Sequence, residues 1–239
     1  MPFVRLACGL AAGLLVLPAI AAGALDEAVL AEARALRERA LADDTAYELV
    51  RSLTTEVGPR SAGSPGDVRA VAWAVERLRA LGFENVRAEP VTVPRWVRGE
   101  AHAEIVAPWP QTLAVAALGG SVATPPGGLE AAVVPFTKIE DLEAQPRENI
   151  AGRIVFFTHR MERSRDGHGY GTAVEARGRG APTAAQLGAV AMVMRYSGTS
   201  SARTPHTGAQ RVADGIPPIP ALALSNPDAD LLDQQLASG

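Results

Sequence analysis

The sequence predicts an α/β fold with a helical N-terminal part and a C-terminal part that mixes helices with strands. Residues 26–81 place apolar side chains at intervals of three or four positions, with Glu and Arg between them, as amphipathic helices do. From about residue 111, short apolar runs alternate with helical segments and Gly/Pro turns. This alternation indicates a small α/β or α+β domain.

Three amphipathic helices are predicted in the N-terminal part. The first follows Asp26, and the second begins at Thr45, whose hydroxyl can cap the helix while Glu48 closes the capping box. The third is capped by Ser64 and ends at Gly82, a residue that readily adopts the left-handed conformation. The third helix is expected to bury one apolar stripe: Val68, Val71, Val75, Leu78 and Leu81.

Two β-leaning segments, residues 86–93 and 101–107, follow these helices. They are joined by a connection at 94–99 that contains Pro and Gly, so a strand pair is predicted. Trp96 lies in that connection. A packing role for Trp96 at the base of the loop is favoured over a role as a binding platform.

Five strands and three helices are predicted in the C-terminal part. The strands are expected at residues 113–118, 129–135, 154–158, 189–195 and 221–224. The helices are expected from Ile139 onward, at 182–187, and at 227–236 with Asn226 as the cap of the last one. The Arg- and Gly-rich residues 160–180 are expected to form an exposed loop, and a second loop precedes Pro220.

The first residues have the pattern of a secretory signal peptide. Residues 1–5 form a short n-region whose basic side chain is Arg5, residues 6–20 are almost wholly apolar, and residues 22–24 (AGA) fit a cleavage site. An uncleaved anchor helix is the alternative, but the apolar run is shorter than the roughly 20 residues that span a bilayer. We therefore expect a secreted or periplasmic protein without disulfides, because the single cysteine, Cys8, leaves with the leader.

Pro108 and Pro110 mark a domain boundary. The expected organisation is a leader at 1–24, an N-terminal part at 25–108 and a C-terminal part at 109–239. The net charge is −3, and no basic run or aromatic-interleaved patch suggests binding to nucleic acid. After residue 25 no stretch is long and apolar enough to cross a membrane, so no membrane partner is expected once the leader is cleaved.

The common signatures of hydrolytic chemistry are missing from the sequence. It contains neither a Gly-x-Ser-x-Gly elbow nor a His-Glu-x-x-His motif. His102 and Glu104 have the spacing of zinc deaminases, but that site also needs paired cysteines. A denser polar cluster could in principle hold a divalent cation: His159, Glu162, Asp166 and His168. A solvated loop is favoured for this cluster, because its neighbouring arginines raise the cost of placing a cation. No catalytic residue and no metal ligand is assigned.

His206 is the histidine that merits a functional hypothesis. It lies between a proline and a glycine in the segment 204–208 (TPHTG), which holds its ring in a defined place. A turn histidine at the surface is the favoured alternative. His206 and the adjacent Thr207 are therefore only candidates for contact with a substrate.

Six segments, taken in order, resemble the N-terminal half of the carboxypeptidase Q-like members of the M28 family of zinc peptidases. They are 57–64 (VGPRSAGS), 89–100 (EPVTVPRWVRGE), 118–128 (LGGSVATPPGG), 152–155 (GRIV), 205–208 (PHTG) and 215–221 (GIPPIPA). Each is weak alone, but together and in this order they are specific, and they are spread across nearly the whole chain after the leader. Residues 152–239 also resemble protease-associated (PA) domains in general.

The resemblance implies a zinc peptidase that trims dipeptides or short peptides, with two zinc ions bridged by a carboxylate and a glutamate that accepts the proton of the bridging water. It also suggests a homodimer. The implied fold is an incomplete zinc-peptidase α/β sandwich followed by a PA-like α/β insert. The family's zinc ligands begin at a His-x-Asp segment beyond the insert, and this sequence has no such segment, so no ligand is carried over.

Two interpretations therefore stand. The favoured one is a zinc peptidase represented by an incomplete chain that is inactive by itself. The alternative is a non-catalytic protein that uses its PA-like surface to bind a partner. In either case two short strands and three helices cannot bury the faces of a peptidase sheet, so residues 25–106 alone are expected to be poorly ordered or self-associating.

Overall fold

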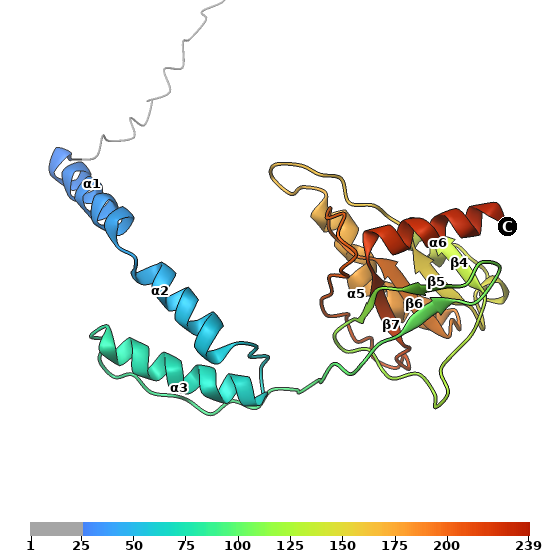
Figure 1. Ribbon diagram of the computed structural model, residues 1–239, viewed down its shortest axis with the longest axis horizontal. Coiled ribbons are helices and arrows are strands. Elements are labelled where there is room, and N and C mark those ends of the chain that lie inside the picture. The colour runs from blue at the N-terminus through green and yellow to red at the C-terminus, as the bar shows by residue number, and fades with distance from the viewer. Residues whose placement is uncertain (1–25) are drawn as a thin grey trace, which may run out of the picture. The chain divides into compact units, whose positions relative to one another are not determined.

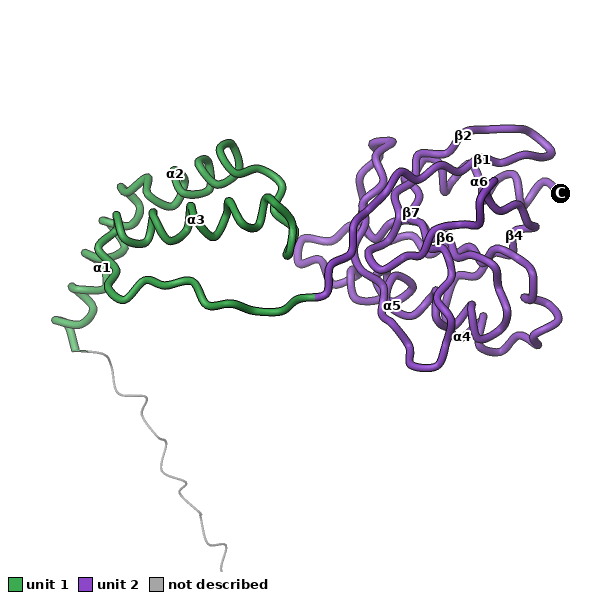
Figure 2. Tube along the Cα trace, turned by 90° about the horizontal axis from the view of Figure 1, so that it is seen from below, with its two compact units in different colours: residues 1–93 green, residues 94–239 purple. Residues whose placement is uncertain are grey.

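The computed structural model describes residues 26–239, and these form two compact units that divide between Val93 and Pro94 (Figure 2). The predicted leader and its cleavage site lie outside the described residues. The first unit is helical and the second contains all the strands assigned in the described chain. None of the described helices is long and apolar enough to cross a membrane.

The first unit contains the three predicted helices (Figure 1). They are α1 (Glu27–Ala42), α2 (Thr45–Ser52), which continues as the π-helical turn η1 (Leu53–Val57), and α3 (Pro65–Ala80). Ser64 caps α3 as predicted, since its Oγ accepts a hydrogen bond from the Asp67 amide at 3.2 Å. The predicted cap of α2 is wrong. Thr45 is the first residue of the helix, and its own amide donates to Asp43 Oδ1 at 2.6 Å.

The apolar stripe of α3 is not buried within the first unit. Val68 is 71% exposed and Leu81 is 47% exposed. Side chains that do meet are mostly polar: Trp73 Nε1 donates to Ser52 Oγ at 2.8 Å, and Arg69 donates to the Val57 carbonyl at 3.2 Å. The expected burial fails because no second apolar layer faces these helices within the unit.

The predicted pairing of residues 86–93 with residues 101–107 is wrong, because only the second segment forms a strand and it pairs with a different one. Residues 86–93 form no strand, whereas β1 (Ala103–Ile105) pairs antiparallel with β2 (Gln111–Leu113). The connection of the observed hairpin, residues 106–110, is nearly as long as the predicted one at 94–99, so loop length does not explain the change of partner. The expected boundary at 108/109 consequently falls inside the connection of this hairpin, while the two compact units divide at 93/94.

The second unit is built on a five-stranded mixed sheet (Figure 1). Its strands are β3 (Val115–Ala117), β4 (Val133–Phe136), β5 (Ile154–Phe157), β6 (Ala191–Arg195) and β7 (Ala221–Leu224). Their order is β3-β7-β6-β5-β4, with β4 to β7 parallel and β3 antiparallel to β7. The predicted strands at 154–158 and 221–224 agree with β5 and β7 almost residue for residue.

Both faces of this sheet are covered, as the alternation of side chains along its strands requires. Val155 and Phe157 of β5 lie in one apolar cluster with Leu142 and Ala184, from α4 (Ile139–Glu143) and α5 (Tyr170–Gln186). Phe156, between them, lies in a second cluster with residues of the β1–β2 hairpin and of α6 (Asn226–Ser238). A short 3₁₀ turn, η2 (Arg147–Asn149), precedes β5.

Two predictions for the helices of this unit are corrected. The segment 160–180 is a loop only as far as residue 169, because α5 begins at Tyr170. Gly180 in this helix lies so close to the sheet that a Cβ would approach Phe157 Cε2 to 2.7 Å. The cap of α6 is Ser225 instead of Asn226: Ser225 Oγ accepts from the Asp228 amide at 3.2 Å.

Candidate functional site

His206 and Thr207 lie in the loop between β6 and β7, next to the end of β3. The exposed His206 ring meets the buried Tyr196 ring edge-on, with 6.1 Å between the ring centroids. The Thr207 hydroxyl donates to the Ala117 carbonyl at 3.1 Å. The sequence-predicted candidates are therefore held against the sheet, with the histidine ring on the surface.

The connection that contains Trp96 is tied to the same place. Arg98 Nε donates to the Ala117 carbonyl at 3.0 Å, and its Nη2 donates to Thr207 Oγ1 at 3.3 Å. The Arg98 guanidinium lies 5.0 Å from the centroid of the Trp96 ring, and Trp96 Nε1 donates to the Ser121 carbonyl at 3.0 Å. These contacts hold Trp96 at the base of the connection, but the residue is 37% exposed and belongs to neither apolar cluster, so its predicted packing role stays a prediction. We call Trp96, Arg98, Tyr196, His206 and Thr207 the edge cluster.

Backbone contacts fix the position of the edge cluster. The Gly119 amide donates to the Gly208 carbonyl at 2.7 Å, and the Gln210 amide donates to the Gly119 carbonyl at 2.9 Å. A Cβ at position 208 would lie 2.7 Å from Arg177 Nε, so a larger residue there would require the flexible Arg177 side chain to move. The cluster contains the guanidinium of Arg98, the hydroxyl of Thr207 and the imidazole of His206, next to the loop that these backbone contacts hold in place. It contains no carboxylate and no thiol, and its single threonine hydroxyl is engaged with the backbone.

The other histidines do not form a metal centre. His102 directly precedes β1, and its Nε2 lies 3.6 Å from Glu100 Oε2 at the surface; it is not paired with Glu104. In the 159–168 cluster, His168 Nδ1 lies 2.8 Å from Asp166 Oδ1, and this hydrogen bond holds the pKa of Asp166 below its ordinary value. Throughout residues 26–239 no three His, Cys, Asp or Glu side chains are grouped as metal ligands would be. The described residues therefore do not fit a zinc ion.

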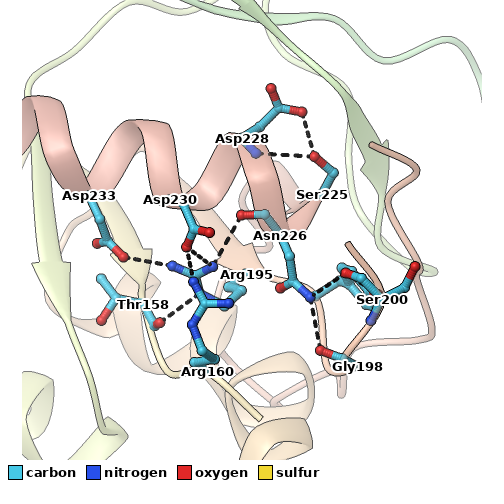
Figure 3. A network of polar contacts seen from close by, with 11 residues as sticks. Thr158, Arg160, Arg195, Gly198, Ser200, Ser225, Asn226, Asp228, Asp230 and Asp233 are labelled. Atoms are coloured by element: carbon cyan, nitrogen blue, oxygen red, sulfur yellow. Dashed lines mark hydrogen bonds and ion pairs between the residues drawn. The ribbon is translucent and has the colours of Figure 1, made fainter. Parts of the chain in front are cut away.

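A buried arginine network is the polar feature that sequence reasoning missed (Figure 3). The Arg195 side chain at the end of β6 is 2% exposed and donates to Asp230 Oδ1 at 2.6 Å and to Asp233 Oδ2 at 2.7 Å. It also donates to the carbonyls of Thr158 at 2.9 Å and Asn226 at 3.2 Å. The signal available in the sequence was a single arginine closing an otherwise apolar strand.

Arg160 extends this network to the surface, since it forms an ion pair with the same Asp230. Burial raises the pKa of Asp233 above its ordinary value, and the opposing effect of Arg195 does not fully cancel that rise. Beside the network lies a cavity of about 310 Å³. It is lined by Arg160, Met161, Arg163, residues 198–201, Asn226, Pro227 and Asp230.

No protein-family profile matches the chain, but individual proteins do. Carboxypeptidase Q of Bos taurus is 34% identical over 198 residues, which are 83% of this chain and 40% of that protein. Carboxypeptidase Q of Homo sapiens is 33% identical over the same shares of both chains. The chain thus spans about two-fifths of the length of these curated relatives.

Solved structures agree with the sequence relatives. The peptidase M28 precursor of Shewanella amazonensis SB2B matches with a TM-score of 0.85 at 46% identity, over 89% of this chain and 48% of that one. The zinc aminopeptidase BSAP of Bacillus subtilis matches with a TM-score of 0.52 at 19% identity, over 79% of this chain and 40% of its own, and supports the fold alone. Across the residues that align, these comparisons identify the chain as a carboxypeptidase Q-like member of the peptidase M28 family.

Proposed function

We propose that this chain is the N-terminal portion of a secreted or periplasmic, zinc-dependent exopeptidase that hydrolyses dipeptides or short peptides. The observation that carries the proposal is the match to the Shewanella peptidase M28 precursor, at 46% identity over 89% of the chain. The carboxypeptidase Q relatives favour the same reaction class. In this proposal the second unit is the PA-like domain, and the assembled enzyme is a homodimer.

The chain's own part in the reaction is structural and on the substrate side. Its described residues hold no ligand set for zinc, so we assign it no chemical step and expect no hydrolysis from it alone. The edge cluster is the proposed substrate-side surface. Within it His206 can donate or accept a hydrogen bond, and Arg98 can pair with a carboxylate.

The proposal is tested with a chimera. This chain is joined to the part of the Shewanella protein that the alignment leaves uncovered, and a series of unblocked dipeptides is offered to the chimera and to the chain alone. The chimera is expected to bind zinc and to release free amino acids. The chain alone is expected to do neither.

Chelation of zinc in the chimera is the matched control, and it should abolish hydrolysis without unfolding the second unit. Stoichiometric zinc and dipeptide cleavage by the chain alone would overturn the assignment of a substrate-side role. A folded, zinc-loaded chimera that cleaves no peptide would overturn the proposed activity itself. Light scattering of the chimera measures whether it is a dimer.

A non-catalytic binding module is the second candidate, and one observation favours it. The second unit has a sheet covered on both faces and two apolar clusters of its own. Such a unit needs no further layer to be stable. A chain that is secreted as a soluble monomer and never found joined to a metal-binding part would support this candidate over the exopeptidase.

A further inference from the structure

We infer that the cavity beside the Arg195 network binds the carboxylate end of a short peptide. The cavity is lined by three residues of the loop after β5 (Arg160, Met161 and Arg163), by residues 198–201 and by the N-terminal part of α6, and all of these belong to the second unit. The inference takes its substrate class from the proposed function, but the binding it predicts needs neither zinc nor hydrolysis.

Among the described charged side chains around the cavity, one guanidinium has no carboxylate paired with it. Arg195 and Arg160 share Asp230, and Arg195 also holds Asp233, so these four side chains balance one another (Figure 3). Arg163 lines the same cavity, and no hydrogen bond or ion pair joins its side chain to another described residue. A third guanidinium beside two carboxylates favours an anionic ligand, and a carboxylate matches its two-pronged geometry.

Asn226 also lines this cavity, and its side chain carries a buried acceptor. Its Nδ2 donates to the carbonyls of Gly198 and Ser200, each at 3.0 Å (Figure 3). These two bonds fix the orientation of the amide, because a flip would turn its oxygen toward two carbonyl oxygens. Its Oδ1 is left buried without a partner among the described residues, and Asn226 is only 4% exposed.

A buried acceptor without a partner is costly, so a ligand that brings an N–H donor to Asn226 gains from satisfying it. The ligand must therefore carry a carboxylate for Arg163 and an N–H group for Asn226. An amino acid or peptide with a free C-terminus has both, attached to the same Cα. The volume of about 310 Å³ is at the lower end for ligand sites, which suits a dipeptide better than a longer chain.

The rigidity of the walls supports a site that exists before the ligand arrives. Arg195 ties β6 to α6 through both aspartates and through the Asn226 carbonyl. Asn226 in turn ties α6 to the 198–200 segment, and the Ser200 amide donates to the Tyr196 hydroxyl at 2.9 Å. A ligand would therefore order little except the Arg163 side chain, and this keeps the entropic cost of binding low.

The test is calorimetric titration of the whole chain, in the presence of a chelator, with four probes: alanyl-alanine, its C-terminal amide, N-acetylalanine and propionate. Alanyl-alanine and N-acetylalanine are expected to bind. The C-terminal amide lacks the carboxylate and propionate lacks the N–H group, and each is expected to bind about tenfold more weakly.

The matched variants are Arg163→Gln and Arg165→Gln, which remove arginines from the same loop inside and outside the cavity lining. Both side chains are exposed, so neither variant should disturb folding, and circular dichroism checks this. Arg163→Gln should weaken alanyl-alanine binding about tenfold, and Arg165→Gln should leave it unchanged.

Equal affinity for the dipeptide and its amide, or equal effects of the two variants, would overturn the inference, as would no binding at millimolar dipeptide. The result is separable from the proposed function. A chimera that hydrolyses peptides while the chain shows no binding removes this site and leaves the exopeptidase proposal intact. If instead the chain binds the dipeptide and the chimera is inactive, the site stands and the exopeptidase proposal is removed.

Discussion

The two units of this chain carry similar amounts of apolar patterning but bury very different amounts of it. In the described part of the first unit, residues 26–93, only Ser52, Val57 and Gly66 are buried. In the second unit, both faces of a five-stranded sheet are sealed by apolar clusters that include fully buried Phe156 and Leu142. An amphipathic helix is stabilised only when a second layer meets its apolar face, and here only the second unit supplies one.

The largest effect expected from this comparison is a difference in folding between the two units when each is expressed alone. Expressed alone, residues 94–239 are expected to unfold in one cooperative thermal transition, because their core is complete. Residues 26–93 alone are expected to show no cooperative transition or to self-associate through the exposed α3 stripe. Circular dichroism melts and light scattering of the two pieces measure both outcomes. A monomeric first unit that melts cooperatively would remove the contrast.

This difference also explains how far the sequence could go in predicting the fold. Helix periodicity located α1, α2 and α3 well, because spacing and caps such as Ser64 are local properties. The same periodicity wrongly predicted that Val68 and Leu81 would be buried, since burial depends on a layer that local pattern cannot supply. The start of α5 was missed for the opposite reason. Its glycines favour a loop locally, whereas Gly180 is required for close packing on Phe157.

A second prediction tests the polar clamp of the second unit, by which we mean buried Arg195 with its partners Asp230 and Asp233. The double substitution Asp230→Ala/Asp233→Ala leaves the Arg195 guanidinium buried without a counter-charge. The free energy of unfolding of the second unit is expected to fall by about 4 kcal/mol. Denaturant unfolding of the whole chain measures it, because the first unit should contribute no transition of its own.

Arg195→Met is the matched control for the clamp. It removes the buried charge, while Asp230 keeps Arg160 and both aspartates remain partly exposed to water. Its cost is expected to be less than half that of the double substitution. If Arg195→Met proves the more damaging change, the clamp stabilises by attraction and the desolvation argument fails.

The Arg195 network shows what part of the candidate site the sequence could not yield. A lone arginine after an apolar strand is visible, but its partners lie more than 30 positions away, on a helix whose cap was assigned to Asn226. Correcting that cap to Ser225 frees the Asn226 side chain for the 198–200 segment and thereby creates the cavity wall. His206 and Thr207 could be proposed from sequence because they lie within one short motif, and their role stays a prediction.

A third prediction compares one leucine from each unit. Leu142→Ala removes a fully buried side chain from the cluster under α4 and α5 and should cost about 3 kcal/mol. Leu78 lies on the α3 stripe and is 40% exposed, so Leu78→Ala should leave the cooperative transition of the chain unchanged. Unfolding by urea measures both. A shift of the same size for Leu78→Ala would mean that the first unit shares the core of the second.

The smallest expected effect compares two exposed aspartates. The Asp166 pKa is lowered chiefly by its hydrogen bond with His168, and the Asp43 pKa is lowered by hydrogen bonds from Thr45 at the start of α2. His168→Ala is expected to raise the Asp166 pKa toward its ordinary value and to leave Asp43 unchanged. Carboxyl-carbon NMR titration measures both in one sample.

The sign of the linked stability follows from these lowered values. A carboxyl group whose pKa is lower in the folded state stabilises that state above its unfolded pKa, and the contribution is lost as the pH falls through the folded value. Both groups are exposed, so the titrations will show the effect more clearly than unfolding will. If the first unit is only loosely ordered in solution, the pKa of Asp43 will have its ordinary value, while the pKa of Asp166 will stay below its ordinary value. A lowered pKa of Asp43 in the isolated first unit would instead show that α2 begins at Thr45 without any second layer packed against it.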